Sequence, residues 1–583
     1  MTDLSPQQQT IVGLPLGAIC VTACAGSGKI RTAIHRLWQM RQLMNDRHGI
    51  VALLSFSNVA VDTFRKDYYL LARERSGSSN SSSVEIDTMD GFLTANVIRA
   101  HAHRSMGAKR TPYLVQGHEP FLKGQTVYDG SRPHRTANLE IGIDGGNFKF
   151  SASFGYSSVP IHPSDAVKSI NRLGPAGAYT HSLGRYWAIR TLQEQPFVLR
   201  ALARRYPAIL VDEAQDIGPV HQAILELLVK SGCQLSLIGD KNQGIYDFSG
   251  ATGKVLADYG ARPGVQSHGL TVNYRSVPAI VEVANKLSGR RDTAMRTAPS
   301  TLSGAFYIPY QKAEKDKLQG AFRSMVDTAA IAHADDMILC RSADWVDEWR
   351  GGEQAQGQGA IKALVNATIS RDKLKRYDDA FRFACAGITS LLADEHGDLV
   401  VRIARNDALI DALSLKRVIW KFARDASSGL PSGTLTADDE WHPLLVKRMR
   451  ALLVELEAKY ALKPAANIGN KLAKKALLNK PIIEMPDLAS SGPATFHVST
   501  MHQVKGESIE AVMYVANKEQ IRAMIDGTNT EVGRIGYVAA TRARNLLVLA
   551  VPENCIGEFE PELIGCGFKK AGTYRTGGVR PWL

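Results

Sequence analysis

The segment Ala23–Ile30 has the residue types of a phosphate-binding loop, except at its last position. A short apolar run precedes it and a helix-like pattern follows, so backbone N–H groups and a helix N-terminus can surround an anion there. Gly26 and Gly28 let the backbone approach phosphates closely, and Lys29 can reach the β- and γ-phosphates. The next position usually carries a Ser or Thr whose hydroxyl binds Mg²⁺, but Ile30 has no oxygen. The segment therefore predicts nucleotide binding and leaves the rate of hydrolysis open.

Two further segments place polar side chains directly after apolar strands. Asp212 and Glu213 follow the run Ile209–Val211, where an aspartate can hold Mg²⁺ and a glutamate can orient or deprotonate water. Gln243 follows a second apolar run and can sense a γ-phosphate or position water. Taken alone, each segment fits a solvated loop better, so the prediction depends on the order of these segments along the chain.

The composition excludes several other classes of protein. With 583 residues, 44% of them hydrophobic and 22% charged, the chain fits about three to five soluble globular domains. It has no apolar stretch of ~18 residues and no N-terminal signal pattern, so we expect a cytoplasmic protein without a membrane partner. Its seven Cys form no C-x-x-C pair, which predicts reduced thiols and no zinc site. The 70 Lys and Arg exceed the 57 Asp and Glu by 13, which fits a polyanionic partner without proving one.

The distribution of apolar runs predicts an α/β fold with two parallel-sheet domains. Short apolar strands alternate with helical stretches at the start of the chain, at 19–21, 51–56 and 84–86. The pattern returns at 208–212, 235–240, 336–341, 496–500, 511–515 and 546–551. The long stretches between these runs are expected to be mainly helical insertions. The first insertion is expected to contain a β-hairpin, formed by 139–143 and 148–152 around a Gly-containing loop.

A series of motifs in a fixed order resembles the UvrD/Rep branch of superfamily 1 helicases, over nearly the whole chain. Asp212–Asp216 matches a D-E-x-x-Q-D box, Leu270–Ser276 an L-x-x-N-Y-R-S motif, and Thr500–Gly506 a T-x-H-x-x-K-G motif. The other segments with this resemblance are Leu4–Gln8, Ala23–Ile30, Ser55–Ala60, Thr88–Phe92, Gly239–Ala251 and Glu531–Ala543. The chain departs from the family where Asp90 replaces a usual His, Phe248 a Trp, and Glu507–Ile509 a Leu-Glu-Phe segment.

The resemblance implies that ATP and Mg²⁺ bind between the two α/β domains. Asp212 would hold Mg²⁺, Glu213 would activate water, and Gln243 would sense the γ-phosphate. Arg275 and Arg542 would contact the γ-phosphate from the second domain. The other nucleotide-binding positions would be Gln8 and Tyr274 at the adenine, and Ala25, Gly26, Ser27, Gly28, Lys29, Ile30 and Arg31 in and after the loop.

The resemblance also implies a single-stranded DNA or single-strand/duplex junction as partner. Its contacts would come from Phe56, Asn58, Phe248 and His502. Without the resemblance, both Phe residues could be core aromatics, and His502 could be a hydrogen-bonded structural His. The Lys-rich run 463–480 fits a solvated helix face better than a duplex contact.

The domain organisation implied by the resemblance is discontinuous. Two RecA-like P-loop domains, 1A and 2A, would each be interrupted by an insertion, 1B or 2B. The expected ranges are 1–92 and 190–274 for 1A, 93–189 for 1B, 275–345 and 490–555 for 2A, 346–489 for 2B, and 556–583 for a C-terminal tail.

The implied function is an ATP-dependent translocase or helicase that moves 3′ to 5′ on single-stranded DNA. The alternative is a weakly catalytic or non-catalytic, nucleotide-gated DNA sensor in a repair or anti-phage complex. The compact chain resembles the helicase halves of defence modules such as Gabija-type systems, and that resemblance implies a separate nuclease partner.

Three interpretations of Ile30 stay open. The ATPase is slow but present, or the site binds nucleotide with hardly any turnover, or Ile30 is a substitution of a former Thr. Thr32 is not expected to replace the missing ligand, because it lies two residues further along the helix and faces elsewhere.

Overall fold

The structure is a computed structural model that divides into two compact units. The first comprises Met1–Gly117, Gly124–Trp349 and Phe496–Leu583, and the second comprises His118–Lys123 and Arg350–Thr495. No helix of the described part of the chain is long and apolar enough to cross a membrane. The described residues are 4–44, 49–76, 83–115, 117, 119–122, 124–154, 157–247, 250–349, 356–373, 375–393, 399, 403, 411–483 and 496–572.

The first of two large parallel sheets in the first unit carries the phosphate-binding loop. Its strand order is β13-β1-β12-β11-β2-β3, and every pair in it is parallel. The predicted strands are confirmed, and the inner ones are nearly continuous apolar runs because helices cover both faces of such a sheet. The strands are β1 (Ile19–Ala23), β2 (Val51–Ser55), β3 (Val84–Thr88), β11 (Ala208–Val211), β12 (Gln234–Gly239) and β13 (Gln266–Leu270).

Strand β13 is absent from the sequence-based prediction. It lies at the sheet edge beside β1, and of its residues only Leu270 is buried, so its sequence carries no apolar run. The helices and short turns around this sheet are α1 (Pro6–Gly13), α2 (Lys29–Met44), α3 (Asn58–Ser76), α8 (Pro196–Arg205), η6 (Ala214–Asp216), α9 (Pro219–Lys230), η7 (Lys241–Gln243) and α10 (Lys254–Gly260).

The second large sheet has the order β18-β17-β19-β20-β16-β21 and is also parallel throughout. The strands predicted at 336–341, 496–500, 511–515 and 546–551 are confirmed. The sequence analysis does not predict strand β16, which contains Pro309, a residue that is rare in central strands. The structure accommodates Pro309 because only Phe306 and Tyr307, which precede it, pair with β21. The strands are β16 (Gly304–Tyr310), β17 (Asp336–Cys340), β18 (His497–Thr500), β19 (Ile509–Val515), β20 (Ala543–Pro552) and β21 (Lys569–Lys570).

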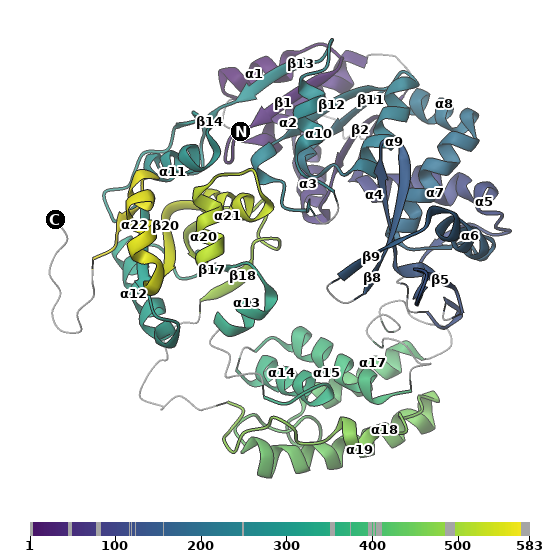
Figure 1. Cartoon of the computed structure of the whole chain (residues 1–583), viewed down its shortest axis with the longest axis vertical. Coiled ribbons are helices and arrows are strands. Elements are labelled where there is room, and N and C mark those ends of the chain that lie inside the picture. The colour runs from purple at the N-terminus through teal and green to yellow at the C-terminus, as the bar shows by residue number, and fades with distance from the viewer. Residues whose placement is uncertain are drawn as a thin grey trace. The chain divides into compact units, whose positions relative to one another are not determined.

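The elements around the second sheet bring distant parts of the sequence together. Figure 1 shows the yellow C-terminal helices beside the teal α11, in agreement with the contact between α11 and α21. Helix α21 is buried from Gly533 to Arg542 and also contacts η7 of the first sheet. These elements are β14 (Val272–Asn273), α11 (Pro278–Ser288), β15 (Thr293–Ala294), η9 (Lys312–Glu314), α12 (Lys315–Thr328), α13 (Ala343–Trp349), α20 (Lys518–Ile525), α21 (Glu531–Arg542), η12 (Glu553–Cys555) and α22 (Ile556–Gly565).

The stretch between α4 and α8 is more mixed than the predicted, mainly helical insertion. Strands β7 and β8 pair in antiparallel register as a hairpin whose turn contains Gly145 and Gly146, and β9 adds a third strand. The predicted limits of this insertion fall inside helices α4 and α7, which are continuous there. The elements are α4 (Met89–Leu93), η2 (Thr94–Ile98), α5 (Arg99–Met106), β4 (Tyr113–Leu114), β5 (Thr126–Tyr128), β6 (Pro133–Arg135), η4 (Thr136–Asn138), β7 (Leu139–Asp144), β8 (Asn147–Phe154), β9 (Ser157–Ile161), α6 (Pro163–Leu173), η5 (Gly174–Ala176), β10 (Ala178–Tyr179) and α7 (His181–Glu194).

The second unit is helical in its described residues, and it overlaps most of the range predicted as the second helical insertion. Its apolar core includes Ile361, Ile388, Ile419 and Trp441, which come from α14, α15, α17 and η11. The elements are η3 (Pro120–Leu122), α14 (Ala360–Asp372), α15 (Tyr377–Leu391), α17 (Ala412–Arg424), η11 (Ala437–Trp441), α18 (His442–Tyr460) and α19 (Ile468–Lys471).

Candidate nucleotide and nucleic-acid sites

The phosphate-binding loop joins β1 to α2, and α2 begins at Lys29. Gly26 and Gly28 have φ angles of +70° and +78°, a region that L side chains rarely adopt. A Cβ atom on Gly28 would lie 2.7 Å from Nε2 of Gln8, so a side chain there would displace this amide. The loop is further fixed by Ser27, whose Oγ donates to the carbonyl of Cys24 at 2.8 Å. The helix N-terminus and loop therefore have the form that binds phosphate.

Gln8 holds this loop in place. Its Nε2 donates to the carbonyl oxygen of Ser27 at 3.0 Å, and its Oε1 accepts from the N–H of Ser5 at 3.0 Å. The second contact is part of a capping box at the start of α1, which explains why the Ser-Pro-Gln-Gln sequence forms a helix there. Gln8 is only 4% exposed. Its predicted contact with adenine stays a prediction.

Ile30 is the second residue of α2 and packs, half-buried, against the apolar core of the first sheet. Thr32 is buried, and its Oγ1 donates to the carbonyl of Gly28 at 3.0 Å. Its hydroxyl is thus bound to the helix backbone, in agreement with the expectation that Thr32 does not replace the missing ligand. The structure therefore gives Ile30 a packing role and supplies no hydroxyl at its position.

The carboxylates after β11 lie in a buried, charged environment. Asp212 is 1% exposed, and its N–H donates to the carbonyl of Leu54 on β2. Burial and the neighbouring Glu213 raise the pKa of Asp212, and Lys29 opposes this. Glu213 has a φ of +51°, which is uncommon for a residue with a side chain. Burial raises the pKa of Glu213, but Lys29 and Lys505 outweigh it, and the net shift is downward.

The surroundings of Asp212 fit a magnesium ion. Among the described residues, none forms a hydrogen bond with Oδ1 of Asp212, although that atom is fully buried. A buried carboxylate oxygen with no partner is costly unless a ligand supplies one, and Mg²⁺ prefers such hard oxygen ligands. No cluster of three His, Cys, Asp or Glu in the described part of the chain could hold the ion alone. Mg²⁺ would therefore depend on nucleotide phosphates and water for its other ligands.

Two arginines approach this site from the elements around the second sheet. We call these elements the second half of the first unit, and those around the first sheet the first half. Arg542, 1% exposed, donates through Nη2 to Oε1 of Gln243 at 3.3 Å. Arg275 donates through Nη1 to the carbonyl of Thr541 at 2.8 Å. Burial and the nearby Arg542 lower the pKa of Arg275 to about 9, with Glu213 acting in the opposite direction. In the described chain, the buried Nε2 of Gln243 has no hydrogen-bond partner. Clustered cations beside an unpartnered amide fit a ligand with several negative charges.

Tyr274 lies next to the phosphate-binding loop and is partly exposed. Its N–H donates to the carbonyl of Gly26 at 2.9 Å, and the residue is 39% exposed. A Cβ on Gly26 would come within 2.5 Å of Cβ of Arg275, so the L-x-x-N-Y-R-S segment packs directly on the loop. The side chain is thus partly open to solvent and can stack on a base. Ala25 is buried in the loop, and Arg31 is part-exposed on α2.

The prediction omitted one ion pair that joins the two halves of the site. Nζ of Lys505 lies 2.7 and 2.6 Å from the two carboxylate oxygens of Asp216, with both side chains less than 10% exposed. Gln215 donates to Glu213 and accepts from the N–H of Asp240 at 3.0 Å, which fixes the box after β11. Burial raises the pKa of Asp216 to about 6 against the effect of Lys505. The sequence signal for this pair is that Asp216 and Lys505 each stand at a fixed position of a motif, D-E-x-x-Q-D and T-x-H-x-x-K-G.

The predicted nucleic-acid residues fall in different places. The half-buried ring of Phe56 meets the ring of His221 edge to face, at a centroid distance of 5.5 Å and an interplanar angle of 71°. Asn58 is exposed at the start of α3. His502 is half-buried, with Nε2 3.1 Å from the carbonyl oxygen of Ile245. Phe248 lies outside the described residues. These roles remain predictions.

Asp90, which departs from the family pattern, has defined partners. Its carboxylate accepts from Nε and Nη2 of Arg185 at 2.9 and 2.6 Å, and Nε2 of His221 lies 3.0 Å away. Burial raises the pKa of Asp90, but Arg185 and His221 more than compensate and leave it below its usual range. Asp90 thus anchors the histidine that Phe56 contacts. Nothing in the sequence pattern indicated Arg185 or His221.

The first unit has a phosphate-binding loop on one parallel sheet and arginines that approach it from the elements of the other sheet. This arrangement is that of P-loop nucleotide-binding proteins. Within that class, the model of the UvrD/REP helicase N-terminal domain matches residues 183–260. The chain is 25% identical over 314 residues to the ATP-dependent DNA helicase UvrD2 of Mycobacterium bovis, covering 49% of this chain and 43% of the relative. The similarity to UvrD/Rep helicases is confirmed, and the chain is UvrD/Rep-like.

Other relatives give a similar picture. DNA helicase II of Salmonella typhimurium is 24% identical over 301 residues, which cover 49% of this chain and 40% of the relative. The ATP-dependent DNA helicase PcrA of Leuconostoc citreum is 21% identical over 393 residues, which cover 63% of this chain and 49% of the relative. The chain thus spans less than half the length of these curated relatives.

Proposed function

We propose that this chain is an ATP-dependent translocase or helicase that acts on single-stranded DNA or on a single-strand/duplex junction. The observation that carries the proposal is the convergence of Lys29, Asp212 and Glu213 from the first sheet with Arg275 and Arg542 from the second. A site built from both halves can link hydrolysis to movement of one half against the other.

Each residue in this site has a defined task. Lys29 and the loop N–H groups bind the phosphates, and Glu213, held ionised by Lys29 and Lys505, orients the attacking water and accepts its proton. Arg275 and Arg542 stabilise the charge on the transferring phosphoryl group. When bound, Mg²⁺ would neutralise charge on the β- and γ-phosphates, with Asp212 as its protein ligand. Because the arginines belong to the second half, full stabilisation requires both halves to be in contact.

Two observations support DNA as the substrate. The chain carries an excess of 13 positive charges, and the relatives are named DNA helicases. We extend the proposal to 3′-to-5′ movement and to the domain ranges 1–92 with 190–274, 93–189, 275–345 with 490–555, and 346–489, on the strength of the family resemblance.

The decisive experiment compares ATP turnover with and without single-stranded DNA. We expect DNA to stimulate the wild-type chain several-fold, and Glu213→Gln to lower the stimulated rate by about 10²-fold or more while ATP binding persists. Glu226→Gln is the matched control, because Glu226 is a surface carboxylate of the same domain, paired with Arg262. Equal rates for Glu213→Gln and wild type would contradict the proposal.

Ile30 favours a second candidate function. Since it packs in the core and offers no ligand, the chain could be a weakly catalytic, nucleotide-gated DNA sensor in a repair or anti-phage complex. By analogy with Gabija-type modules, a separate nuclease would then be its partner. ATP binding that alters DNA affinity without measurable turnover favours the sensor, whereas turnover stimulated by DNA favours the motor.

A further inference from the structure

Three helices of the first unit meet at an ionic cluster beside Phe56. Asp90 is the second residue of α4, Arg185 lies on α7, and His221 lies on α9. Helix α7 contacts both of the other helices (Figure 1). Arg185 belongs to the range predicted for the first insertion, 93–189, whereas Asp90 and His221 belong to the ranges predicted for the first parallel-sheet domain. The cluster thus joins these two parts of the chain next to a predicted DNA contact.

The carboxylate of Asp90 is fixed by two partners. Its oxygens accept separately from Nε and Nη2 of Arg185, and Oδ1 also lies 3.0 Å from Nε2 of His221. A bidentate bond between a guanidinium and a carboxylate sets the direction as well as the strength of the contact. The side chain of His221 is buried, and those of Asp90 and Arg185 are partly buried. Asp90 is therefore a rigid acceptor for His221.

His221 is held in one protonation state and one orientation. Burial lowers the pKa of His221, the hydrogen bond to Asp90 opposes this, and the net shift is downward, so the ring is neutral at pH 7. A neutral imidazole has a single N–H, and the ionised carboxylate of Asp90 can only accept. The N–H is therefore on Nε2, and this hydrogen bond fixes the tautomer and the angle of the ring.

The fixed imidazole is a side wall for the ring of Phe56. Phe56 comes directly after β2, and its half-buried ring meets His221 edge to face. This arrangement is favourable because the positive edge of one ring meets the negative face of the other. The residues that follow Phe56 up to Val59 are exposed, and Val59 itself is 77% exposed. The wall formed by His221 thus limits the orientation of an aromatic side chain where the chain turns towards solvent.

We propose that Asp90 and His221 are positioning residues that hold the Phe56 ring in the orientation in which it stacks on a base of a bound single strand. A ring that is already ordered loses less entropy on binding than one that must first be ordered. Stacking accepts any base, so the orientation of the ring sets affinity and not sequence preference. The proposal rests on the proposed function, because it requires a bound strand. It deepens that function by giving a task to Asp90, where the chain departs from the helicase pattern.

The test measures the affinity of the full-length protein for a fluorescein-labelled single-stranded oligonucleotide by fluorescence anisotropy. Asp90→Ala should weaken binding about fivefold, which is less than the loss of a whole stacked base. Asp90→Asn keeps an oxygen that accepts from His221, and it should weaken binding only about twofold. Asp165→Asn is the matched control and should bind as wild type, because Asp165 is a surface carboxylate of α6 that pairs with Lys168.

A double-mutant cycle separates positioning from a general structural role. Phe56→Leu should weaken binding about tenfold, and adding Asp90→Ala should then weaken it less than about twofold further, because no ring is left to orient. If Asp90 only joined the helices, its loss would have the same effect with and without the ring. Equal effects of Asp90→Ala in both backgrounds, or wild-type affinity for Asp90→Ala alone, would overturn the proposal.

The outcomes also distinguish this proposal from the proposed function. If wild type binds the strand and Phe56→Leu binds it equally well, the positioning role is overturned and the proposed function stands. Wild-type protein that fails to bind single-stranded DNA overturns both. If circular dichroism shows that Asp90→Ala does not fold, the cycle is run with His221→Gln, which keeps a donor for Asp90 and removes the aromatic wall. The same non-additivity with Phe56→Leu is then expected, and additive effects contradict the proposal.

Discussion

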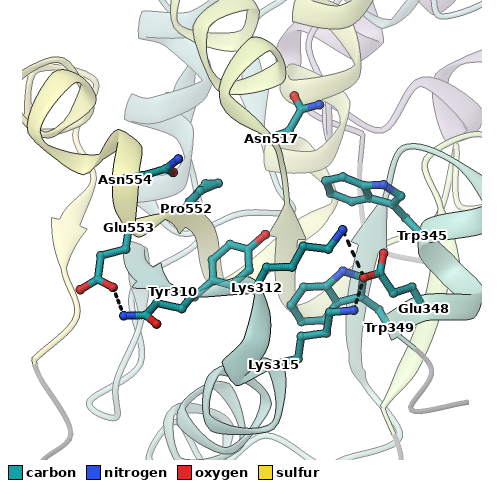
Figure 2. A pocket seen from close by; sticks show the side chains of 11 residues that line it. Tyr310, Lys312, Lys315, Trp345, Glu348, Trp349, Asn517, Pro552, Glu553 and Asn554 are labelled. Atoms are coloured by element: carbon teal, nitrogen blue, oxygen red, sulfur yellow. Dashed lines mark hydrogen bonds and ion pairs between the residues drawn. The ribbon is translucent and has the colours of Figure 1, made fainter. Parts of the chain in front are cut away.

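The two large sheets in the described part of the first unit each have six strands that run parallel to one another, yet the carboxyl edges of the two sheets differ in chemistry. The edge of the first sheet gathers charge: the buried Asp212 and the half-buried Glu213 and Lys29. The edge of the second sheet gathers aromatic rings, with Trp345 and Trp349 around a cavity of about 690 Å³ (Figure 2). Two sheets of the same kind thus carry different residues at this edge: groups that can bind phosphate on the first sheet, and aromatic rings on the second. The fold provides the edge, and the side chains decide what binds there.

The contrast has two exceptions, and they explain how the sheets work together. Arg542 ends a helix of the second sheet but donates to Gln243 of the first, and Lys505 follows β18 but pairs with Asp216. Each places a buried cation of the second half in the charged edge of the first half. If the contrast is functional, removing these cations should damage the first edge most.

Arg542→Ala should give the largest effect. Loss of a guanidinium that stabilises the transferring phosphoryl group should lower the DNA-stimulated kcat by about 10³-fold. Arg522→Ala is the control, since Arg522 belongs to the second sheet's helices but pairs at the surface with Glu562. Steady-state phosphate release measures both variants. A kcat within threefold of wild type for Arg542→Ala would remove Arg542 from the site.

Sequence reasoning predicted the charged edge better than the aromatic one. The motifs around Asp212 and Arg542 have residue types fixed by phosphate chemistry, so type and order sufficed to place them. Tyr310 and Trp349 lie in no such pattern, because an aromatic cavity arises from packing of separate strand ends. Strand β13 and Pro309-containing β16 were missed for a related reason: neighbouring strands stabilise them, and their own residues carry little strand signal.

The pair of Asp216 and Lys505 tests the connection between the sheets through pH. Burial raises the folded-state pKa of Asp216 from 3.8 to about 6, so the folded protein binds this proton more tightly than the unfolded chain. The contribution of Asp216 to the free energy of unfolding is therefore fully present below pH 4. It is lost as the pH rises to 6, by about 3 kcal/mol at most. The melting temperature of wild type minus that of Asp216→Asn should fall over this window. A difference that grows with pH would reverse the assignment.

Tyr274 is the exposed aromatic of the charged edge, and its variants should change affinity more than rate. Tyr274→Ala should raise the KM for ATP about tenfold with little change in kcat, since stacking on a base contributes about 1–3 kcal/mol. Tyr274→Phe keeps the ring and should behave as wild type. The N–H contact with Gly26 is retained in both variants. A fall in kcat at constant KM would instead indicate that the ring positions the loop.

Ile30→Thr tests whether the charged edge lacks a ligand. A hydroxyl at this position would offer an oxygen ligand at the start of α2, and we expect ATP turnover to rise about three- to tenfold, roughly 0.7–1.4 kcal/mol of barrier. The half-buried packing of Ile30 against the first core should make the variant slightly less stable, by about 1 kcal/mol. Thr32→Val is the matched control, because its hydroxyl donates to the carbonyl of Gly28 and its loss should leave turnover unchanged. Turnover that stays constant or falls in Ile30→Thr would mean that Asp212, the phosphates and water already complete the metal shell. Ile30 would then be a core residue without consequence for the rate.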